Sequence, residues 1–283
     1  MRQSTNSVET SSPYTYCLGK ALPDGSNLYY ASLYEKEDHK PIVIGLHTLL
    51  QELNDVLLEC SDPGVARLKF RWWQEELDRL EQQQARHPVS RYLQQKVRPK
   101  ADMIALLQQA VTGFEDLLMP EQPHLYEDSL DLFRRSAGRI WCSSARLTGI
   151  TDNNAINNIE TMAAAYYLLL SLQHPNTFMT ESCCVVPTET IPWETLQAAR
   201  QDNTDPVAFQ SLVQRIIDTL ENSYESASDQ EKRNFKHGLI LNRLAFKTAR
   251  EIVKSDSRLL SMRVSLTPVR KLFTAWWTRL FLR

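Results

Sequence analysis

The sequence predicts an all-α protein, organised as one domain of helices packed around a central cavity. Three observations support this fold class. Apolar residues recur at three- and four-residue spacing along almost the whole chain, which is the period of an amphipathic helix. No convincing run alternates apolar and polar residues as a strand would. No internal repeat, long linker or shift in composition divides the 283 residues, of which 42% are hydrophobic, so one sizeable core is expected.

The predicted elements follow in order. Residues 1–12 are polar and are expected to form a disordered tail. The apolar stripe that begins at Val43 predicts a helix over roughly 41–60. Ser61-Asp62-Pro63 ends it and starts the next, because Ser and Asp cap helices and Pro suits a first turn. Later apolar stripes predict helices around residues 66–80, 104–114, 130–142, 155–173 and 235–253.

Composition excludes several classes of function. Lys and Arg number 32 against 34 Asp and Glu, and this net charge of −2 argues against a nucleic-acid partner. The chain lacks the glycine-rich phosphate-binding loops and the hydrolase elbow. Five cysteines without a CxxC motif are expected to be reduced thiols, which favours a cytoplasmic location. No apolar run approaches the roughly 20 residues of a membrane span.

Several short motifs occur in the order known from one family. The chain resembles the squalene/phytoene synthase family of head-to-head prenyl synthases over roughly residues 25–272. This resemblance implies an isoprenoid-synthase-like fold for residues 13–267. It also implies condensation of two prenyl diphosphates, with Mg²⁺ held by two aspartate-rich motifs on facing helices. The motifs are Leu28-Tyr29-Tyr30-Ala31, Gln51–Val56, Ser61-Asp62-Pro63, Lys69–Leu77, His87-Pro88, Asp116, Arg135-Ser136-Ala137-Gly138 and Val186-Pro187.

The first aspartate-rich motif is degenerate. Its two carboxylate positions hold Asn54 and Leu58, and Leu cannot bind a metal. Asp55 and Glu59, with Glu52 one turn earlier, form an acidic face, and a displaced Mg²⁺ site there is the alternative interpretation. A one-residue offset rotates that pair by about 100° around the helix, away from the family's ligands. The preferred interpretation is therefore an exposed acidic edge.

The second motif is missing altogether. Placing Val186-Pro187 on the family's Leu-Pro puts Leu170 at an expected Asn, and His174 and Phe178 at the two expected Asp. Glu181 is the only acidic residue between 161 and 182, so a shifted register does not restore the motif. Trp141 stands where the family has Gly facing the cavity. It is predicted either to fill space that a prenyl tail needs or to pack outward.

The leading hypothesis is a non-catalytic relative that needs no cofactor and binds a lipid or isoprenoid, or a protein partner at a membrane. One eukaryotic relative is an assembly factor for respiratory complex I. Such a protein is expected to have a narrowed pocket without carboxylates. The alternatives are a prenyl synthase whose Asp55 and Glu59 point into an open pocket, or a transferase that acts without magnesium. The candidate ligand-binding residues are Tyr30, Asn54, Asp55, Trp141, Arg135, Leu170 and His174.

The last segment, residues 268–283, is basic and aromatic. No acidic residue follows Asp256. At about 1.5 Å per residue a helix here spans about 24 Å, short for crossing a bilayer. It is predicted to lie on an anionic membrane surface, peripherally on the inner membrane, or alternatively to cover the core of the fold. The predicted membrane-binding residues are Arg270, Lys271, Phe273, Trp276, Trp277 and Arg279.

Overall fold

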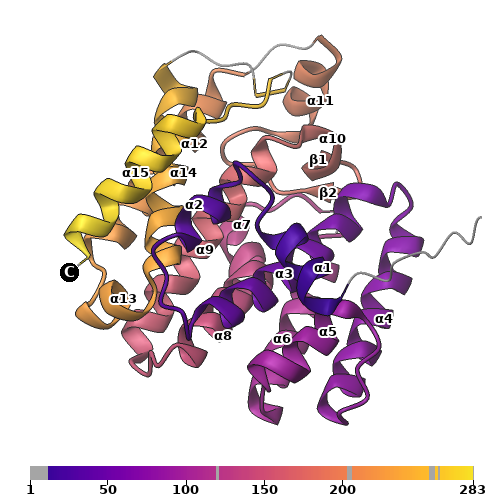
Figure 1. The fold of residues 1–283 in the computed structure, drawn as a ribbon. Helices are drawn as coiled ribbons and strands as arrows, with labels where there is room; N and C mark the ends of the chain where they lie inside the picture. Colours follow the sequence, from indigo (N-terminus) through magenta and orange to yellow (C-terminus); the bar gives the residue numbers. More distant parts are fainter. Residues whose placement is uncertain (1–11, 119–120, 203–205, 255–258, 261, 283) are drawn as a thin grey trace, which may run out of the picture.

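Helices form almost all of the regular structure, as the sequence predicts (Figure 1). The computed structural model describes residues 12–118, 121–202, 206–254, 259–260 and 262–282. The predicted tail lies outside these ranges except for Ser12, whose side chain caps the first helix. The helices are α1 Pro13–Ala21, α2 Asn27–Ser32, α3 Lys40–Glu59, α4 Pro63–Glu81, α5 Pro88–Tyr92, α6 Ala101–Glu115, α7 Tyr126–Phe133, α8 Arg139–Leu147, α9 Asn153–Leu172, α10 Pro175–Phe178, α11 Trp193–Asp202, α12 Ala208–Glu225, α13 Asp229–Asn234, α14 Lys236–Lys254 and α15 Pro268–Phe281.

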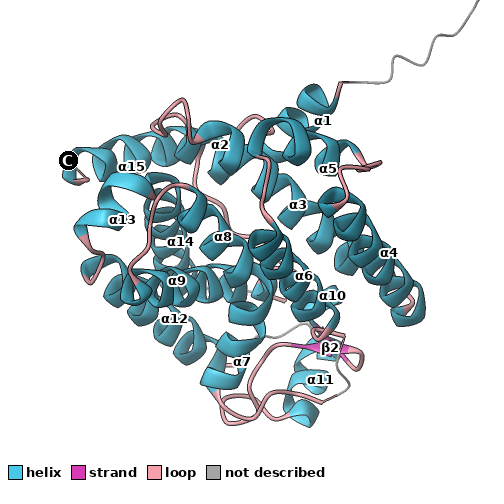
Figure 2. Cartoon of the chain, turned by 90° about the horizontal axis from the view of Figure 1, so that it is seen from below, coloured by secondary structure: helices cyan, strands magenta, loops and turns pink. Residues whose placement is uncertain are grey.

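Departures from regular α-helix are few within the described residues. Two π-helical turns, η1 (Leu93–Val97) and η2 (Arg134–Gly138), extend α5 and join α7 to α8. Strands β1 (Met179–Thr180) and β2 (Cys183–Cys184) pair antiparallel, with Met179 opposite Cys184 (Figure 2). The sequence did not predict these strands, because two residues are too short to show an alternating pattern.

The boundary between α3 and α4 shows why local sequence fixes these elements. Asp62 has an extended backbone, and its carboxylate accepts a hydrogen bond from the Val65 N–H at 2.9 Å. Pro63 follows in the first turn, where its missing N–H removes no helical hydrogen bond. This is the predicted cap. In the same helix Trp73 is buried and Trp72 is 40% exposed, so only one indole belongs to the core.

The core lies where α3, α8, α9, α12 and α14 pack against one another. On α9 the block Ala163-Ala164-Ala165 is fully buried, and small side chains allow neighbouring helices to approach closely. The same closeness occurs between α6 and η2. A Cβ atom added to Gly113 would lie 2.2 Å from the Arg135 carbonyl oxygen.

Candidate functional site

A cavity of about 560 Å³ opens among α1, α3, α9, α14 and the segment before α15. Burial distinguishes its floor from its rim. His47, Leu50, Leu241 and other floor residues are buried, whereas Gln51 and Arg263 at the rim are exposed. The cavity has the size of a small-molecule site, and its floor is mostly apolar. We refer to it as the interhelical pocket.

The acidic face of α3 is paired with a lysine of α1. The Lys20 ammonium lies 3.1 Å from a Glu52 oxygen and 2.7 Å from an Asp55 oxygen. All three side chains are at least two-thirds buried. Burial alone would lower the pKa of Lys20, but its hydrogen bonds to Asp55 and Glu52 outweigh burial and raise it. Lys20 is therefore a fixed internal cation between the two carboxylates.

Further donors complete the pairing of these carboxylates. Gln51 donates to the second Asp55 oxygen at 2.9 Å, and the Tyr16 hydroxyl donates to Glu52. Burial, followed by that hydrogen bond to Glu52, raises the pKa of Tyr16 to about 12. Both oxygens of Asp55 thus have partners within the protein. The interpretation of Glu52 and Asp55 as an exposed edge is wrong, because α1 covers them.

The residues that line the pocket match neither expectation in full. Asp55 lines it, contrary to the expectation of a pocket without carboxylates. Glu59 is exposed and does not line it, contrary to the alternative of an Asp55–Glu59 metal site. Within the described ranges, no three His, Cys, Asp or Glu side chains come together as metal ligands would.

The residues at the degenerate motif positions do face the pocket. Asn54 and Leu170 line it from α3 and α9, and His174 lines it just beyond the end of α9. Gln173 also lines it, and its side-chain oxygen accepts a hydrogen bond from the Val264 N–H at 3.0 Å. Helix α9 therefore offers apolar and neutral polar groups where the family resemblance implies carboxylates.

The rim is basic. Arg263 and Lys271 both line the pocket. Burial and then the charge of Arg263 lower the pKa of Lys271, and the same two causes lower the pKa of His174. Lys271 donates to the Gly25 carbonyl at 2.9 Å. Among the described residues no carboxylate forms an ion pair with Arg263 or Lys271, so this corner carries positive charge suited to an anion.

Trp141 packs inward, which decides between its two predicted placements. It is fully buried in α8. Its ring centroid lies 6.0 Å from that of His47, 5.5 Å from that of Tyr166 and 5.7 Å from that of Phe235. Trp141 does not itself line the pocket, but it supports His47 and Tyr166, which do. The indole therefore fills the space behind the floor.

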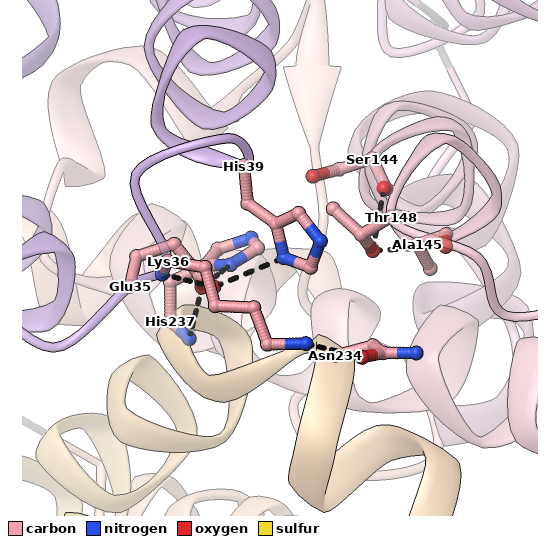
Figure 3. Close-up of polar contacts among 8 residues, drawn as sticks. All are labelled: Glu35, Lys36, His39, Ser144, Ala145, Thr148, Asn234 and His237. Carbon is pink, nitrogen blue, oxygen red and sulfur yellow. Dashed lines mark hydrogen bonds and ion pairs between the residues drawn. The ribbon is translucent and has the colours of Figure 1, made fainter.

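A buried carboxylate lies on the far side of His47. Figure 3 shows Glu35 held by His237, His39 and Lys36. Glu35 accepts from His237 Nδ1 at 2.7 Å, His39 Nδ1 at 3.3 Å, and the backbone N–H groups of His237 and Lys36, each at 3.1 Å. Burial alone would raise the pKa of Glu35, but His237 and these backbone groups lower it to about 2.

The His237 ring meets the His47 ring edge-on, 5.6 Å between centroids. Burial and then His237 lower the pKa of His47 well below its usual value, so His47 is neutral at pH 7.

Two predicted ligand-binding residues lie elsewhere. Tyr30 is buried in α2, with its ring edge-on to Tyr29 at 5.2 Å, and does not line the pocket. Arg135, the second, does not line the pocket either. It pairs with Asp116 at 3.0 Å on the surface, where the two side chains are 50% and 35% exposed.

The predicted membrane-binding residues divide into two groups. Phe273, Trp276 and Trp277 are exposed on α15. The three cations have partners within the protein. Arg270 pairs with Glu251 at 2.6 Å, Arg279 lies 5.3 Å from the centre of the Tyr34 ring, and Lys271 reaches into the pocket. The helix itself begins at Pro268, capped by the Thr267 side chain.

The sequence did not predict which other residues lie in and beside the pocket. These are Lys20, His47, Arg263 and the Glu35–His237 pair. Lys20 and Arg263 are far apart in the chain and show no spacing that marks a site. The run Gly19-Lys20-Ala21 ends a helix whose acidic partners follow about 30 residues later. Only the packing of α1 on α3 brings these charges together.

Comparisons with known proteins agree on one family. A family model described as squalene/phytoene synthase matches residues 23–270. The structure of squalene synthase HpnC from Alicyclobacillus acidocaldarius is similar at TM-score 0.66 and 15% identity, covering 86% of this chain and 94% of that one. A dehydrosqualene synthase crystallised with a ligand is similar at TM-score 0.71 and 14% identity, covering 95% and 96%. No curated protein sequence matches the chain.

Proposed function

This chain belongs to the squalene/phytoene synthase family, and we propose that it is a non-catalytic member that binds one anionic isoprenoid-type amphiphile without a metal ion. The observation that supports this most is Lys20. Its ammonium lies between the Glu52 and Asp55 carboxylates of α3 and offsets one of their two negative charges within the protein. Fold alone does not supply the family's chemistry, which depends on the groups that line the site.

Metal-assisted ionisation of a diphosphate needs carboxylate oxygens that are free to bind Mg²⁺. Asp55 is the one carboxylate of α3 and α9 that lines the pocket, and its oxygens are bound to Lys20 and Gln51. The facing wall offers Leu170 and His174. A Mg²⁺ ion would have to displace Lys20 and would then find no α9 carboxylate among the residues that line the pocket. The residues present do not fit the family's metal cluster.

Binding of an anionic amphiphile follows from the two ends of the same pocket. Arg263 and Lys271 offer guanidinium and ammonium groups that suit a phosphate or diphosphate. Leu50, Leu169 and Leu241 form an apolar floor that suits a hydrocarbon chain. The direct cationic contacts would take over the charge neutralisation that metal ions provide elsewhere, so the head group is held without being activated.

A catalytic reading remains as the alternative, since Asp55 does line the pocket. In that case the chain would be a prenyltransferase of the squalene or phytoene synthase type, with Mg²⁺ at Asp55 and Glu52 after Lys20 moves away. Glu59 would need a rotation of α3 to take part, because it is exposed outside the pocket.

Two measurements on the pure protein separate these functions. First, farnesyl or geranylgeranyl diphosphate is incubated with Mg²⁺ or Mn²⁺, with and without NADPH, and released diphosphate is measured. We expect none. Metal-dependent release that Asp55→Ala abolishes would overturn the proposal.

Second, farnesyl diphosphate is titrated in excess EDTA by calorimetry. We expect saturable binding that the Arg263→Gln/Lys271→Gln variant weakens about tenfold or more, since each charged hydrogen bond is worth about 1.5–3 kcal/mol. Binding that requires Mg²⁺ would contradict it.

A further inference from the structure

Helix α15 buries small side chains and exposes large apolar ones, which is the reverse of a helix that forms the core. Its buried side chains are the small Ala275 and Thr278, and it packs on α14 and α2. Its large apolar side chains face solvent instead. We call this surface the aromatic face; its members are Val269, Leu272, Phe273, Trp276, Trp277 and Phe281, between 42% and 77% exposed.

The rings of the aromatic face form one cluster. Phe273 stacks on Trp277 with 5.9 Å between ring centroids, Trp276 lies 5.9 Å from Phe273, and Trp277 lies 5.5 Å from Phe281. The cluster runs from Phe273 to Phe281, about 12 Å along the helix. Contiguous exposed apolar surface of this kind marks a place that another surface covers.

The composition of this segment identifies what covers it. No Asp or Glu occurs after residue 256, whereas Arg270 and Arg279 flank the exposed rings. Arg270 pairs with Glu251 but its side chain is 49% exposed, and the contact of Arg279 with the Tyr34 ring does not neutralise its charge. Trp and Phe beside basic residues suit the boundary between lipid head groups and acyl chains, and the basic residues favour anionic lipids. In the described residues no helix is long and apolar enough to cross a bilayer. The helix therefore suits a position in the plane of a membrane surface.

The same helix forms part of the rim of the interhelical pocket. Lys271 lies between Arg270 and Leu272 in sequence, yet its ammonium turns inward, lines the pocket and donates to Gly25. Val264 and Ser265, which precede the helix, also line the pocket. One helix thus presents rings to the outside and a cation to the pocket.

We propose that the aromatic face of α15 docks on an anionic lipid surface and so places the rim of the pocket against the bilayer, from which the ligand enters. The head group of an amphiphile lies at the lipid–water boundary, the depth at which Lys271 and Arg263 would meet it. The hydrocarbon chain then moves from the acyl layer to the apolar floor without crossing water. The docking half is independent of the proposed function, whereas the loading half rests on it.

Docking is tested by sedimentation with vesicles of phosphatidylcholine alone or with about 30% phosphatidylglycerol. The test variant is Phe273→Ser/Trp276→Ser/Trp277→Ser. The matched control is Leu68→Ser/Trp72→Ser, which removes exposed apolar side chains of α4 at the opposite end of the molecule (Figures 1 and 2). We expect the anionic vesicles to bind the wild type and the control, and the test variant to lose about tenfold or more in partitioning. Equal partitioning of all three proteins, shown to be folded by circular dichroism, would overturn docking on this face.

Loading is tested with anionic vesicles that contain geranylgeranyl diphosphate, in EDTA, by the amount of ligand that moves to the protein with time. The aromatic-face variant should take it up more slowly while keeping wild-type affinity for farnesyl diphosphate in solution. Leu170→Trp, which narrows the pocket, should bind vesicles normally and take up nothing. Equal uptake rates by wild type and the aromatic-face variant would overturn loading from the bilayer. A wild-type protein that binds vesicles but does not bind the ligand would refute the proposed function and leave the docking proposal intact.

Discussion

At the scale of single residues, Lys20 changes what an acidic helix face can do. Its ammonium occupies the space between Glu52 and Asp55 where a divalent cation would otherwise be attracted. The pairing is mostly shielded from water, so removing its cation leaves buried charge uncompensated and costs more than breaking an exposed ion pair. Chemistry at this site therefore depends on a residue of another helix as much as on α3 itself.

Lys20→Ala is expected to lower the free energy of unfolding by about 1–2 kcal/mol, because it leaves two mostly buried carboxylates without their cation. Urea denaturation at pH 7 measures the change. The exposed Lys69, substituted by Ala, is the matched control and should change stability by less than about 0.5 kcal/mol. A Lys20→Ala variant as stable as the control would contradict the role of Lys20 as an internal counter-ion.

Glu35 should make folding stability depend on pH in the acid range. The pKa of its carboxyl is lowered from 4.5 to about 2 in the folded state, so the stabilisation is fully present above pH 4.5 and is lost as the pH falls towards 2. A shift of this size corresponds to roughly 3 kcal/mol. Chemical denaturation of wild type and Glu35→Gln between pH 7 and pH 2 gives the comparison. The difference between the two proteins should shrink as the pH falls through that window, and a constant difference would speak against it.

At the scale of elements, the contact between α6 and η2 depends on a residue without a side chain. Gly113 is buried in α6, and the backbone of Arg135 and Ser136 fills the space where a Cβ atom would lie. The rigid backbone on the other side cannot move aside as a flexible side chain does.

Gly113→Ala is therefore expected to destabilise the protein by about 2–3 kcal/mol, measured by urea denaturation. Gly19→Ala is the matched control, because it is also helical and a Cβ atom there meets nothing within 4 Å. That control should be neutral or slightly stabilising, since alanine favours helix more than glycine by about 0.5–1 kcal/mol. Equal effects at the two sites would show that the helices separate easily at η2.

At the scale of the whole molecule, the interior behind the pocket is built from aromatic rings contributed by several helices. Trp141 of α8 contacts His47 of α3, Tyr166 of α9 and Phe235 next to α14. These helices form the core, so Trp141 connects the walls of the pocket to one another.

Removing this ring should cost about 3–5 kcal/mol of unfolding free energy, because Trp141→Ala leaves a large cavity in the core. Trp72→Ala, at a 40% exposed indole, should cost far less, under about 1.5 kcal/mol. Denaturant titrations of both variants make the comparison. Similar losses would mean that the space behind the pocket collapses freely when the indole is removed.

The family and the all-α fold could be predicted from the sequence. Capping at Asp62-Pro63 and the helical spacing of apolar residues are local properties, and each is set by backbone sterics and short-range hydrogen bonds. The two-residue strands were not predictable, since their pairing depends on the chain turning back between Thr180 and Cys183.

The sequence by itself determined the family, the helices and the loss of acidic residues at the second motif, because these are written in residue types and their local spacing. Only the tertiary structure decided how the remaining charges are used. It placed Lys20 between Glu52 and Asp55, moved Arg135 to the surface, turned Trp141 inward and brought Arg263 beside Lys271. The reason is physical: ion pairing and burial depend on distances between helices far apart in the chain, and helical periodicity specifies which face is apolar but not which helix covers it.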